Sequence, residues 1–336
     1  MREIKEVYPL IQEGIKKIVI TMHQKPDPDA MGSALGLKLF LAGFGHELTV
    51  VSPTNWPAFL NWMPGAEAVI DYEANPFPAI KAVEEAEMIF CLDFNTLSRT
   101  KNLAPHLEKS TAIKVLIDHH QQPQSESFQF GVSDTGKSST AEMVYDFIKQ
   151  SDYPERISIE AAECLYAGVM SDTGSFRFES TTADVHRMIA HLKDIGLEHF
   201  RIHEYIYDNY LENRLRFIGH VLSNRMEIYY EYNTALIGIS KKDLLRFHIK
   251  TGDTEGLVNF PLSIQGIKLA ALVIDRDEER KWSFRSKGQF NTNEFARKYF
   301  NGGGHFNASG GRSDESLDDT IDRFKAVLKE VEDQLK

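Results

Sequence analysis

Six acidic and histidine side chains, spread over the first 172 residues of the sequence, could together hold two divalent cations. They are His23, Asp27, Asp29, Asp93, His119 and Asp172. Carboxylate oxygens combined with some imidazole nitrogen suit Mn²⁺, Mg²⁺, Fe²⁺ or Zn²⁺, and the residue types do not choose among these ions. Two cations roughly 3.5–4 Å apart can bind a bridging hydroxide and neutralise phosphate oxygens. The set therefore predicts metal-dependent hydrolysis of a phosphoester bond.

Each of these residues, taken alone, also has an ordinary structural explanation. Asp29, for example, stands before an apolar helix-like segment and could simply cap that helix. Adjacent histidines directly after an apolar run, as at 119 and 120, are harder to explain in this way. Because all these residues occur together in one chain, a single catalytic site is favoured over a set of unrelated structural roles.

The elements that must position these side chains are indicated by the hydrophobic pattern. Four apolar segments are typical of buried strands, and they are residues 16–23, 46–52, 87–93 and 114–120. Helix-like segments alternate with them at 30–42, from Ser139 onward and at 161–170. Ser139 with Glu142 three residues later is a capping-box signature. This alternation predicts an α/β fold in which a mostly parallel sheet is flanked by helices.

The predicted strands deliver the reactive side chains to one place. His23, Asp93 and the run 118–120 each end a strand-like segment. In an open parallel sheet, ligands bind beyond the carboxyl ends of the strands. Asp172 ends an apolar helix-like segment and could reach the same edge. We therefore expect the six side chains to lie close together.

The pattern changes after Arg225 and predicts a second, smaller α/β domain with a mixed sheet. A hairpin over 227–240, a strand pair at 268–276 and 281–288, a Gly-rich loop and a C-terminal amphipathic helix are expected. The predicted organisation is a metal-binding catalytic domain over 1–190, a helical connection over 191–224 and a substrate-binding domain over 225–336. The active site is expected in the cleft between the two domains.

The composition argues against several classes of protein. A net charge of −11 makes the chain a poor binder of long nucleic acid, because Lys and Arg supply most affinity for the phosphate backbone. No run approaches the roughly 18–20 apolar residues of a membrane span, and the charged first residues are unlike a signal peptide. Cys91 and Cys164 stand in apolar runs and are expected in the core. A cytoplasmic location is the expectation, and the sequence leaves a homodimer open.

Four segments, in order along the chain, resemble the motifs of the DHH phosphoesterase superfamily. They are HQKPDPDAMGS (23–33), CLDFN (91–95), IDHH (117–120) and GVMSDTGSFRF (168–178). In the second half, FRSKG (284–288) and GGGHFNASGG (302–311) are similar to the DHH-associated domain. Within the superfamily the chain looks like the small oligoribonuclease/pAp phosphatases, or nanoRNases. RecJ exonucleases have extra DNA-binding domains, and family II pyrophosphatases have a different C-terminal domain.

The resemblance implies a role for each residue of the site. The residues implied for one cation are His23, Asp27 and Asp93. Those implied for the second are Asp29, Asp93, His119 and Asp172, so that Asp93 would bridge the two cations. Asp118 would support the site from behind, and His120 would face the substrate phosphate. The nucleophile would be a hydroxide that bridges two cations, with Mn²⁺ expected first and Mg²⁺ or another ion as the alternative.

A second group of residues is expected to bind the substrate. The Gly-rich segment allows backbone N–H groups to approach an anion closely, although a flexible connection would have the same composition. The resemblance implies that Arg285, Ser286, Gly302, Gly303, Gly304 and His305 bind the nucleotide. Arg177, just after the SDTG motif, is a further candidate, with a surface salt bridge as the alternative. A short cleft with a phosphate clamp suits pAp or oligoribonucleotides of a few residues.

Three other functions stay open beside hydrolysis of short oligoribonucleotides and pAp. A cyclic-di-AMP or pApA phosphodiesterase would need the same metals and a nucleotide clamp. A non-catalytic nucleotide sensor, or a site that binds structural metal only, would bind Mn²⁺ without turnover. One position also departs from the family pattern, since the first motif commonly has Asn where this chain has Lys25. The usual hydrogen bond from that position is therefore in doubt, whereas metal binding by His23, Asp27 and Asp29 should be unaffected.

Overall fold

The computed structural model describes residues 1–250, 252–276 and 279–336, and the chain divides into two compact units. The first unit is Met1–Asn209 and the second is Tyr210–Lys336. The division lies between helices α8 (His199–Tyr207) and α9 (Glu212–Asn224), inside the stretch 191–224. None of the helices in the described ranges is long and apolar enough to cross a lipid bilayer.

The first unit is built on a seven-stranded sheet in which every neighbouring pair of strands is parallel. Across the sheet the strands are β1 (Arg2–Glu3), β7 (Phe130–Ser133), β6 (Ile113–Asp118), β5 (Met88–Leu92), β2 (Lys17–Thr21), β3 (Glu47–Ser52) and β4 (Ile70–Asp71). The four strands expected from the sequence are β2, β3, β5 and β6, which confirms the predicted parallel sheet. The strands β1, β4 and β7 have only two, two and four residues, too few to produce a recognisable pattern.

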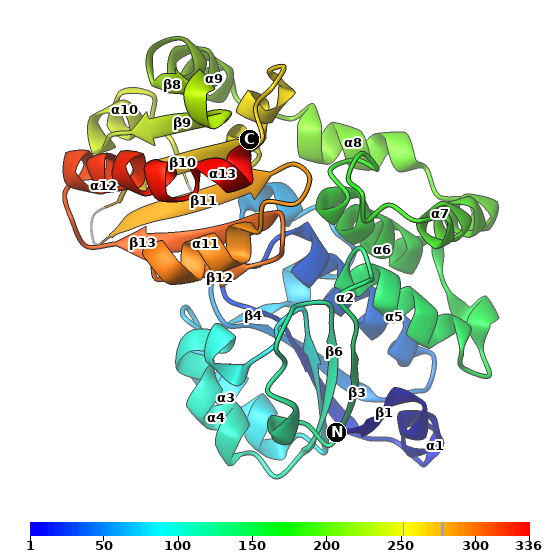
Figure 1. Ribbon diagram of the computed structural model, residues 1–336. Helices are drawn as coiled ribbons and strands as arrows, with labels where there is room; N and C mark the ends of the chain where they lie inside the picture. Colours follow the sequence, from blue (N-terminus) through cyan, green and yellow to red (C-terminus); the bar gives the residue numbers. More distant parts are fainter. Residues whose placement is uncertain (251, 277–278) are drawn as a thin grey trace. The chain divides into compact units, whose positions relative to one another are not determined.

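Helices cover both faces of this sheet, as Figure 1 shows. On one face lie α2 (Pro28–Ala42), α5 (Thr140–Lys149) and α6 (Ile159–Asp172), and on the other lie α3 (Pro76–Glu85) and α4 (Ala104–Lys109). Side chains alternate between the two cores along β5: Phe90 and Leu92 enter the first core, and Ile89 and Cys91 the second. The short α1 (Val7–Gln12), the longer α7 (Ala183–Ile195) and α8 also belong to this unit.

Helices α2 and α6 pack unusually closely. A Cβ at Gly32 of α2 would lie 2.3 Å from the carbonyl oxygen of Cys164 in α6, so only glycine fits at this point. The helix α6 is buried over most of its length, as its all-round apolar sequence predicts, and both cysteines are buried in the core. Its C-terminal residue is Asp172, which the close packing fixes relative to α2.

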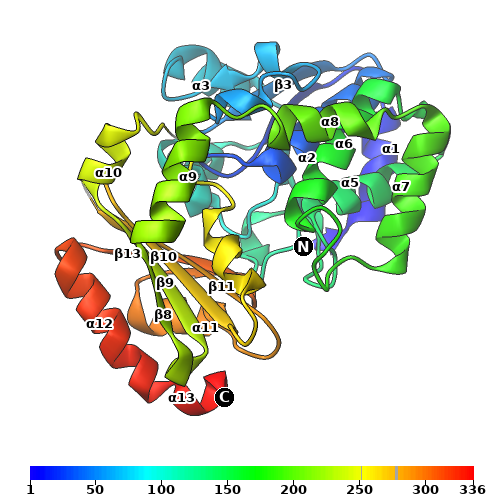
Figure 2. The same ribbon diagram turned by 90° about the horizontal axis from the view of Figure 1, so that it is seen from above.

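The second unit contains a mixed six-stranded sheet of order β12-β13-β11-β10-β9-β8. The strands are β8 (Met226–Tyr229), β9 (Thr234–Ile239), β10 (Leu269–Asp275), β11 (Arg280–Ser286), β12 (Gly303–Gly304) and β13 (Ala308–Ser313). Among the described strands of this sheet, only β9 and β10 are parallel neighbours. Helices α11 (Thr292–Tyr299), α12 (Leu317–Glu330) and α13 (Glu332–Leu335) cover one face, and α9 with α10 (Lys241–Arg246) covers the other (Figures 1 and 2).

The Gly-rich segment of the second unit differs from the prediction. The sequence predicts a loop over 302–311, whereas the structure forms an antiparallel pair from β12 and β13. A Cβ at Gly302 would lie 1.9 Å from the carbonyl oxygen of Gly310, so glycine is required because two backbones nearly touch. The expected hairpin of β8 and β9 and the antiparallel pair of β10 and β11 are confirmed.

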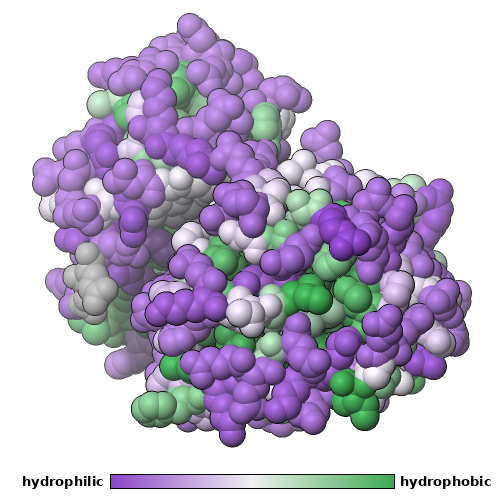
Figure 3. Space-filling model, turned by 90° about the horizontal axis from the view of Figure 1, so that it is seen from below, coloured by the Kyte–Doolittle hydropathy of each residue, from purple (hydrophilic) through white to green (hydrophobic). Residues whose placement is uncertain are grey.

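The space-filling view of Figure 3 shows the character of one face of the molecule. On the face that Figure 3 shows, hydrophilic residues predominate, and the apolar areas between them are smaller. The acidic net charge of −11 is thus compatible with an ordinary solvated surface.

Candidate metal centre

The reactive side chains meet where the strand order of the first sheet reverses. From β2 the chain continues outward to β3 and β4, then returns to β5 on the other side of β2 and continues to β6 and β7. Open parallel sheets bind ligands at such a switch point, beyond the carboxyl ends of the strands. His23 follows β2, Asp93 follows β5, and the run 118–120 begins at the last residue of β6. The structure therefore brings these strand-end residues to one edge.

Asp93 lies at the middle of the cluster and faces a histidine with each carboxylate oxygen. Its Oδ1 is 3.4 Å from His119 Nε2, and its Oδ2 is 3.3 Å from His23 Nε2. Its backbone has φ +62°, a left-handed conformation that Asp adopts more readily than most residues. Its amide donates to the carbonyl of Ile117 at 3.1 Å, which ties the turn to β6. The carboxylate is thus held where it could contact two cations.

The first possible donor set consists of His23, Asp27 and Asp93, whose ligand atoms all lie within 4.8 Å of one another. Asp27 is also the N-cap of α2, because its Oδ1 accepts from the amides of Asp29 and Ala30, each at 3.0 Å. Its other oxygen lies 3.8 Å from His23 Nε2. The alternative that Asp29 caps this helix is wrong, since Asp29 lies in the first turn.

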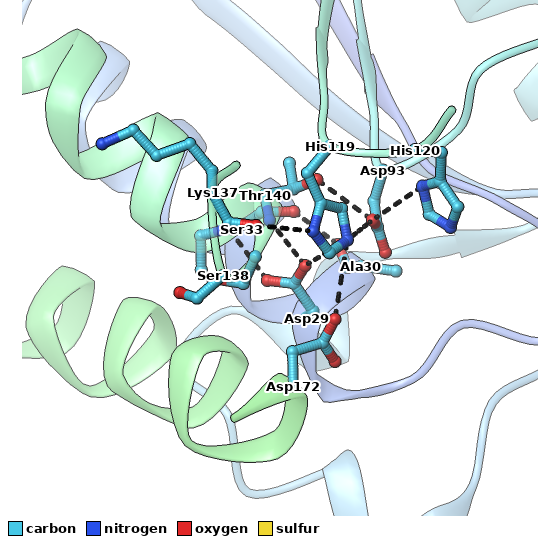
Figure 4. Close-up of polar contacts among 12 residues, drawn as sticks. Asp29, Ala30, Ser33, Asp93, His119, His120, Lys137, Ser138, Thr140 and Asp172 are labelled. Atoms are coloured by element: carbon cyan, nitrogen blue, oxygen red, sulfur yellow. Dashed lines mark hydrogen bonds and ion pairs between the residues drawn. The ribbon is translucent and has the colours of Figure 1, made fainter. Parts of the chain in front are cut away.

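The second possible donor set consists of Asp29, Asp93 and His119, again within 4.8 Å of one another. Asp29 is fully buried, and its Oδ2 is 3.9 Å from His119 Nε2. Asp172 approaches the same nitrogen from the end of α6, with its Oδ2 at 3.5 Å (Figure 4). The six side chains expected to bind metal are therefore close together, in two groups that share Asp93.

Both histidines turn the same ring nitrogen toward the carboxylates. His23 Nδ1 lies 2.8 Å from the carbonyl oxygen of Gln24, and His119 Nδ1 lies 3.4 Å from that of Lys137. A carbonyl beside Nδ1 keeps a proton on that nitrogen and directs Nε2 to the other partners. Histidines that bind metals commonly have this arrangement.

The charges of the cluster do not balance among its own residues. The imidazoles of His23 and His119 face four carboxylates. The carboxylates are those of Asp27, Asp29, Asp93 and Asp172. Burial lowers the pKa of His23 and of His119, but the neighbouring carboxylates outweigh burial and raise both pKa values to about 10. Burial, and then the charge of Asp27, raises the pKa of Asp172 to about 8. Protons supply positive charge that the cluster needs, and divalent cations fit the same oxygen and nitrogen donors.

Asp118 and His120 form a buried pair beside this cluster. His120 Nδ1 is 2.7 Å from Asp118 Oδ1 and 3.7 Å from Asp93 Oδ1. Burial lowers the pKa of His120 more than Asp118 raises it. The ring is thus held in one orientation as the donor to Asp118. Its role at a substrate phosphate stays a prediction.

The start of α5 makes contacts that the sequence does not predict. The amides of Thr140 and Ala141 donate to the two carboxylate oxygens of Asp29 at 2.7 and 2.8 Å, and Thr140 Oγ1 donates to Asp93 Oδ1 at 3.0 Å. Ser139 is the N-cap, but Glu142 accepts from Ser138 instead of Ser139, so the predicted capping box forms only in part. Thr140 and Asp29 are 111 positions apart, and a local pattern carries no signal over that distance.

The residues expected to bind substrate in the second unit lie on β11 and around β12. Arg285 and Ser286 end β11, and Gly303 and Gly304 form β12, between Gly302 and His305. Ser286 is buried, and its hydroxyl donates to the carbonyl of Phe290 at 2.7 Å and accepts from Asn307 at 2.8 Å. Nucleotide binding by this group stays a prediction.

Two candidate positions of the first unit are exposed. Arg177 Nε donates to the carbonyl of Gly174 at 2.7 Å. Lys25 has φ +50°, and its amide donates to Thr54 Oγ1 at 2.6 Å. Asn adopts positive φ more readily than Lys, so the residue common in the family's first motif would suit this backbone better.

Two segments of the chain match known domain families. Residues 17–169 match the DHH family, N-terminal domain, and residues 238–336 match the DHHA1 domain. A crystal structure of an exopolyphosphatase-related protein from Bacteroides fragilis is 38% identical, with a TM-score of 0.94 over 98% of this chain and 96% of that one. The fold of the chain is therefore that of this relative.

Proteins named for two activities resemble the chain over most of its length. The probable bifunctional oligoribonuclease and PAP phosphatase NrnA of Streptococcus mutans is 29% identical over 317 residues, which are 93% of this chain and 95% of that protein. The bifunctional oligoribonuclease and PAP phosphatase NrnA of Bacillus subtilis is 28% identical over 87% of this chain and 88% of its own length. The cyclic-di-AMP phosphodiesterase GdpP of Bacillus subtilis is more distant, at 24% identity over 47% of its length. The chain belongs to the DHH family, and its C-terminal part is a DHHA1 domain.

Proposed function

We propose that this protein hydrolyses phosphoester bonds in short nucleotides at two divalent cations bound in the first unit. The observation that carries the proposal is the position of Asp93, whose two oxygens lie 3.3 and 3.4 Å from His23 and His119. A carboxylate shared by two donor sets would place two cations close together, as two-metal phosphoesterases require. The relatives named oligoribonuclease and PAP phosphatase support oligoribonucleotides of a few residues and pAp as substrates.

The ligands we propose for each cation follow the two donor sets, with Asp172 added to the second. One cation would be held by His23, Asp27 and Asp93. The other would be held by Asp29, Asp93, His119 and Asp172. When bound, such cations supply an activated water and neutralise phosphate charge, and Mn²⁺ is the ion we propose.

His120 would orient the substrate phosphate beside the cations. Asp118 accepts the Nδ1 proton at 2.7 Å, which fixes the ring and directs Nε2 away from Asp118. Burial lowers the pKa of His120, but an approaching phosphate would favour the protonated ring, because a nearby negative charge raises the pKa of a histidine. The ring could then donate a charge-assisted hydrogen bond to the phosphate.

The second unit would bind the part of the nucleotide that does not react. The residues we propose for this role are Arg285, Ser286, Gly302, Gly303, Gly304 and His305, with Arg177 of the first unit as a further candidate. A guanidinium such as that of Arg285 can bind a terminal phosphate through two parallel hydrogen bonds. Because Ser286 already bonds Phe290 and Asn307, we expect it to shape the site instead of contacting phosphate directly.

A competition among four substrates tests the proposal. The purified protein is incubated with Mn²⁺ and equal amounts of pAp, pApA, a longer RNA and cyclic-di-AMP, and the products are separated by chromatography. Rapid release of AMP from pAp and pApA, with slow attack on the other two, would support the proposed substrates. Preferential opening of cyclic-di-AMP would replace them with a second messenger. No turnover of any substrate, despite bound Mn²⁺, would contradict the proposed catalysis and favour a nucleotide sensor.

A further inference from the structure

We propose that the segment Lys137–Glu142, which leads into α5, positions three metal ligands at once, with Thr140 and Glu142 as its positioning residues. The inference rests on the proposed function, because it concerns the cation that Asp29, Asp93 and His119 would hold. It adds residues that belong to neither donor set and contact no cation themselves.

Three residues of this six-residue segment contact three different ligands. The amides of Thr140 and Ala141 donate to both oxygens of Asp29, at 2.7 and 2.8 Å. The Thr140 hydroxyl donates to Asp93 Oδ1 at 3.0 Å, and the carbonyl of Lys137 lies 3.4 Å from His119 Nδ1 (Figure 4). The ligands themselves come from α2, from the turn after β5 and from the end of β6. A single short segment therefore sets the relative positions of side chains from three separate elements.

Glu142 holds this segment in place from inside. Its side chain is only 3% exposed, and its Oε2 accepts from the amide and the hydroxyl of Ser138 at 2.8 and 2.7 Å. Its Oε1 lies 3.0 Å from Lys137 Nζ, which also pairs with Asp146 at 2.6 Å. A buried carboxylate with three donors is a strong restraint, because each donor would be costly to leave unpaired. The restraint acts on the two residues that precede the N-cap Ser139.

The positioning is needed because the carboxylate ligands repel one another. Carboxylates that crowd around an empty cation site tend to turn apart, and hydrogen bonds from a rigid element oppose that movement. Loss of a hydrogen-bonding partner behind a metal ligand typically lowers metal affinity or activity by about 10–100-fold. We expect losses in that range for the cation nearer to α5.

Two pairs of variants test this role. Thr140→Val keeps the shape of the buried side chain and removes its hydroxyl, whereas Thr140→Ser restores the hydroxyl. Glu142→Gln removes the negative charge and places an NH₂ group among the donors that Glu142 now accepts from. Asp146→Asn is its control, because it changes the other ion-pair partner of Lys137 but leaves the hydrogen bonds between Glu142 and Ser138 in place. Binding of Mn²⁺ alone is measured by titration calorimetry, and the melting temperature is measured in EDTA.

The expected result is weaker binding of one of two Mn²⁺ ions, by about 10–100-fold, in Thr140→Val and Glu142→Gln. Binding should return toward the original affinity in Thr140→Ser and be unchanged in Asp146→Asn. If Thr140→Val and Glu142→Gln only melt earlier in EDTA and bind both ions as tightly as the original protein, the role is structural and the inference is overturned. If the original protein binds no Mn²⁺, the proposed function fails first, and the inference fails with it.

Discussion

Replacing Asp172 by Asn should make the metal-free protein more stable, although it removes a proposed metal ligand. The side chain of Asp172 is 22% exposed and lies 3.5 Å from His119. Burial, and then the charge of Asp27, raises its pKa from 3.8 to about 8. At neutral pH the folded protein without cations therefore keeps a proton that the unfolded chain has released. Asn resembles the protonated acid in shape and has no proton to retain.

The size of the effect follows from this difference in pKa. Between about pH 4 and pH 8 the folded state binds one more proton at this site, so the free energy of unfolding falls as the pH rises through that range. At pH 7 the full difference corresponds to about 4 kcal/mol, because a tenfold change in an equilibrium is about 1.4 kcal/mol. Solvent at the partly exposed carboxyl reduces the figure, and we expect a gain of about 2–4 kcal/mol for Asp172→Asn.

Thermal unfolding in EDTA between pH 4 and pH 8 measures this gain. For a unit of this size, about 2–4 kcal/mol corresponds to a melting temperature roughly 4–16 °C higher at pH 7. The gap should close toward pH 4, where the unfolded chain also binds the proton. Asp184→Asn is the matched control, because it makes the same change of charge on a side chain of α7 that is 71% exposed. Saturating Mn²⁺ should reverse the order, since only the original protein keeps the carboxylate ligand.

Either of two results would refute the explanation based on the proton of Asp172. If Asp172→Asn melts at or below the temperature of the original protein in EDTA at pH 7, the cluster is not short of positive charge. A gap that stays constant from pH 8 to pH 4 would equally exclude the proton on Asp172 as its cause.

The remaining substitutions test the bridging ligand, the helix contact and the first motif. Asp93→Asn should fold, because Asn also adopts φ +62°. Its kcat on pAp should fall about 10²–10⁴-fold. Near-normal turnover would show that Asp93 does not bridge two cations. Gly32→Ala, whose Cβ would lie 2.3 Å from a backbone carbonyl of α6, should lose about 1–3 kcal/mol or more in urea unfolding. Gly219→Ala in α9, where a Cβ would meet nothing within 4 Å, should gain about 0.5–1 kcal/mol instead. Lys25→Asn should gain about 0.5–1 kcal/mol at φ +50° with unchanged activity, and lost activity would assign the lysine to substrate binding.

The strands that carry the site could be predicted because burial on both faces gives them continuous apolar runs. His23 lies two residues after β2, Asp93 directly follows β5, and Asp118 is the last residue of β6, so the positions of these strands in the sequence also located the candidate ligands. The cap of α2 could have been predicted as well. Pro28 favours the first position of a helix, which makes the preceding Asp27 the natural N-cap.

Other features could not be predicted because they depend on contacts between distant segments. Thr140 forms its hydrogen bonds to Asp29 and Asp93 because α5 packs beside α2. The residue types near Thr140 in the sequence do not indicate these contacts. The structural reason for the glycines at 302–304 could not be predicted from composition either. A flexible loop and a tight pair of strands both require glycine, and the close approach of Gly302 to Gly310 distinguishes them only in three dimensions.

Stabilisation by Mn²⁺ should be confined to the first unit, because all the proposed ligands lie within Met1–Asn209. At 100 times its dissociation constant, a ligand that binds only the folded state adds about 2.7 kcal/mol, or roughly 5–11 °C for a unit of this size. Scanning calorimetry should therefore show one transition that moves with Mn²⁺ and one that does not. Trp282 is fully buried in the second unit, whereas Trp56 and Trp62 lie in the first. Tryptophan fluorescence of a variant with phenylalanine at positions 56 and 62 should therefore follow the transition that Mn²⁺ does not move. If both transitions move together, either the two units unfold as one or the second unit also contributes to cation binding.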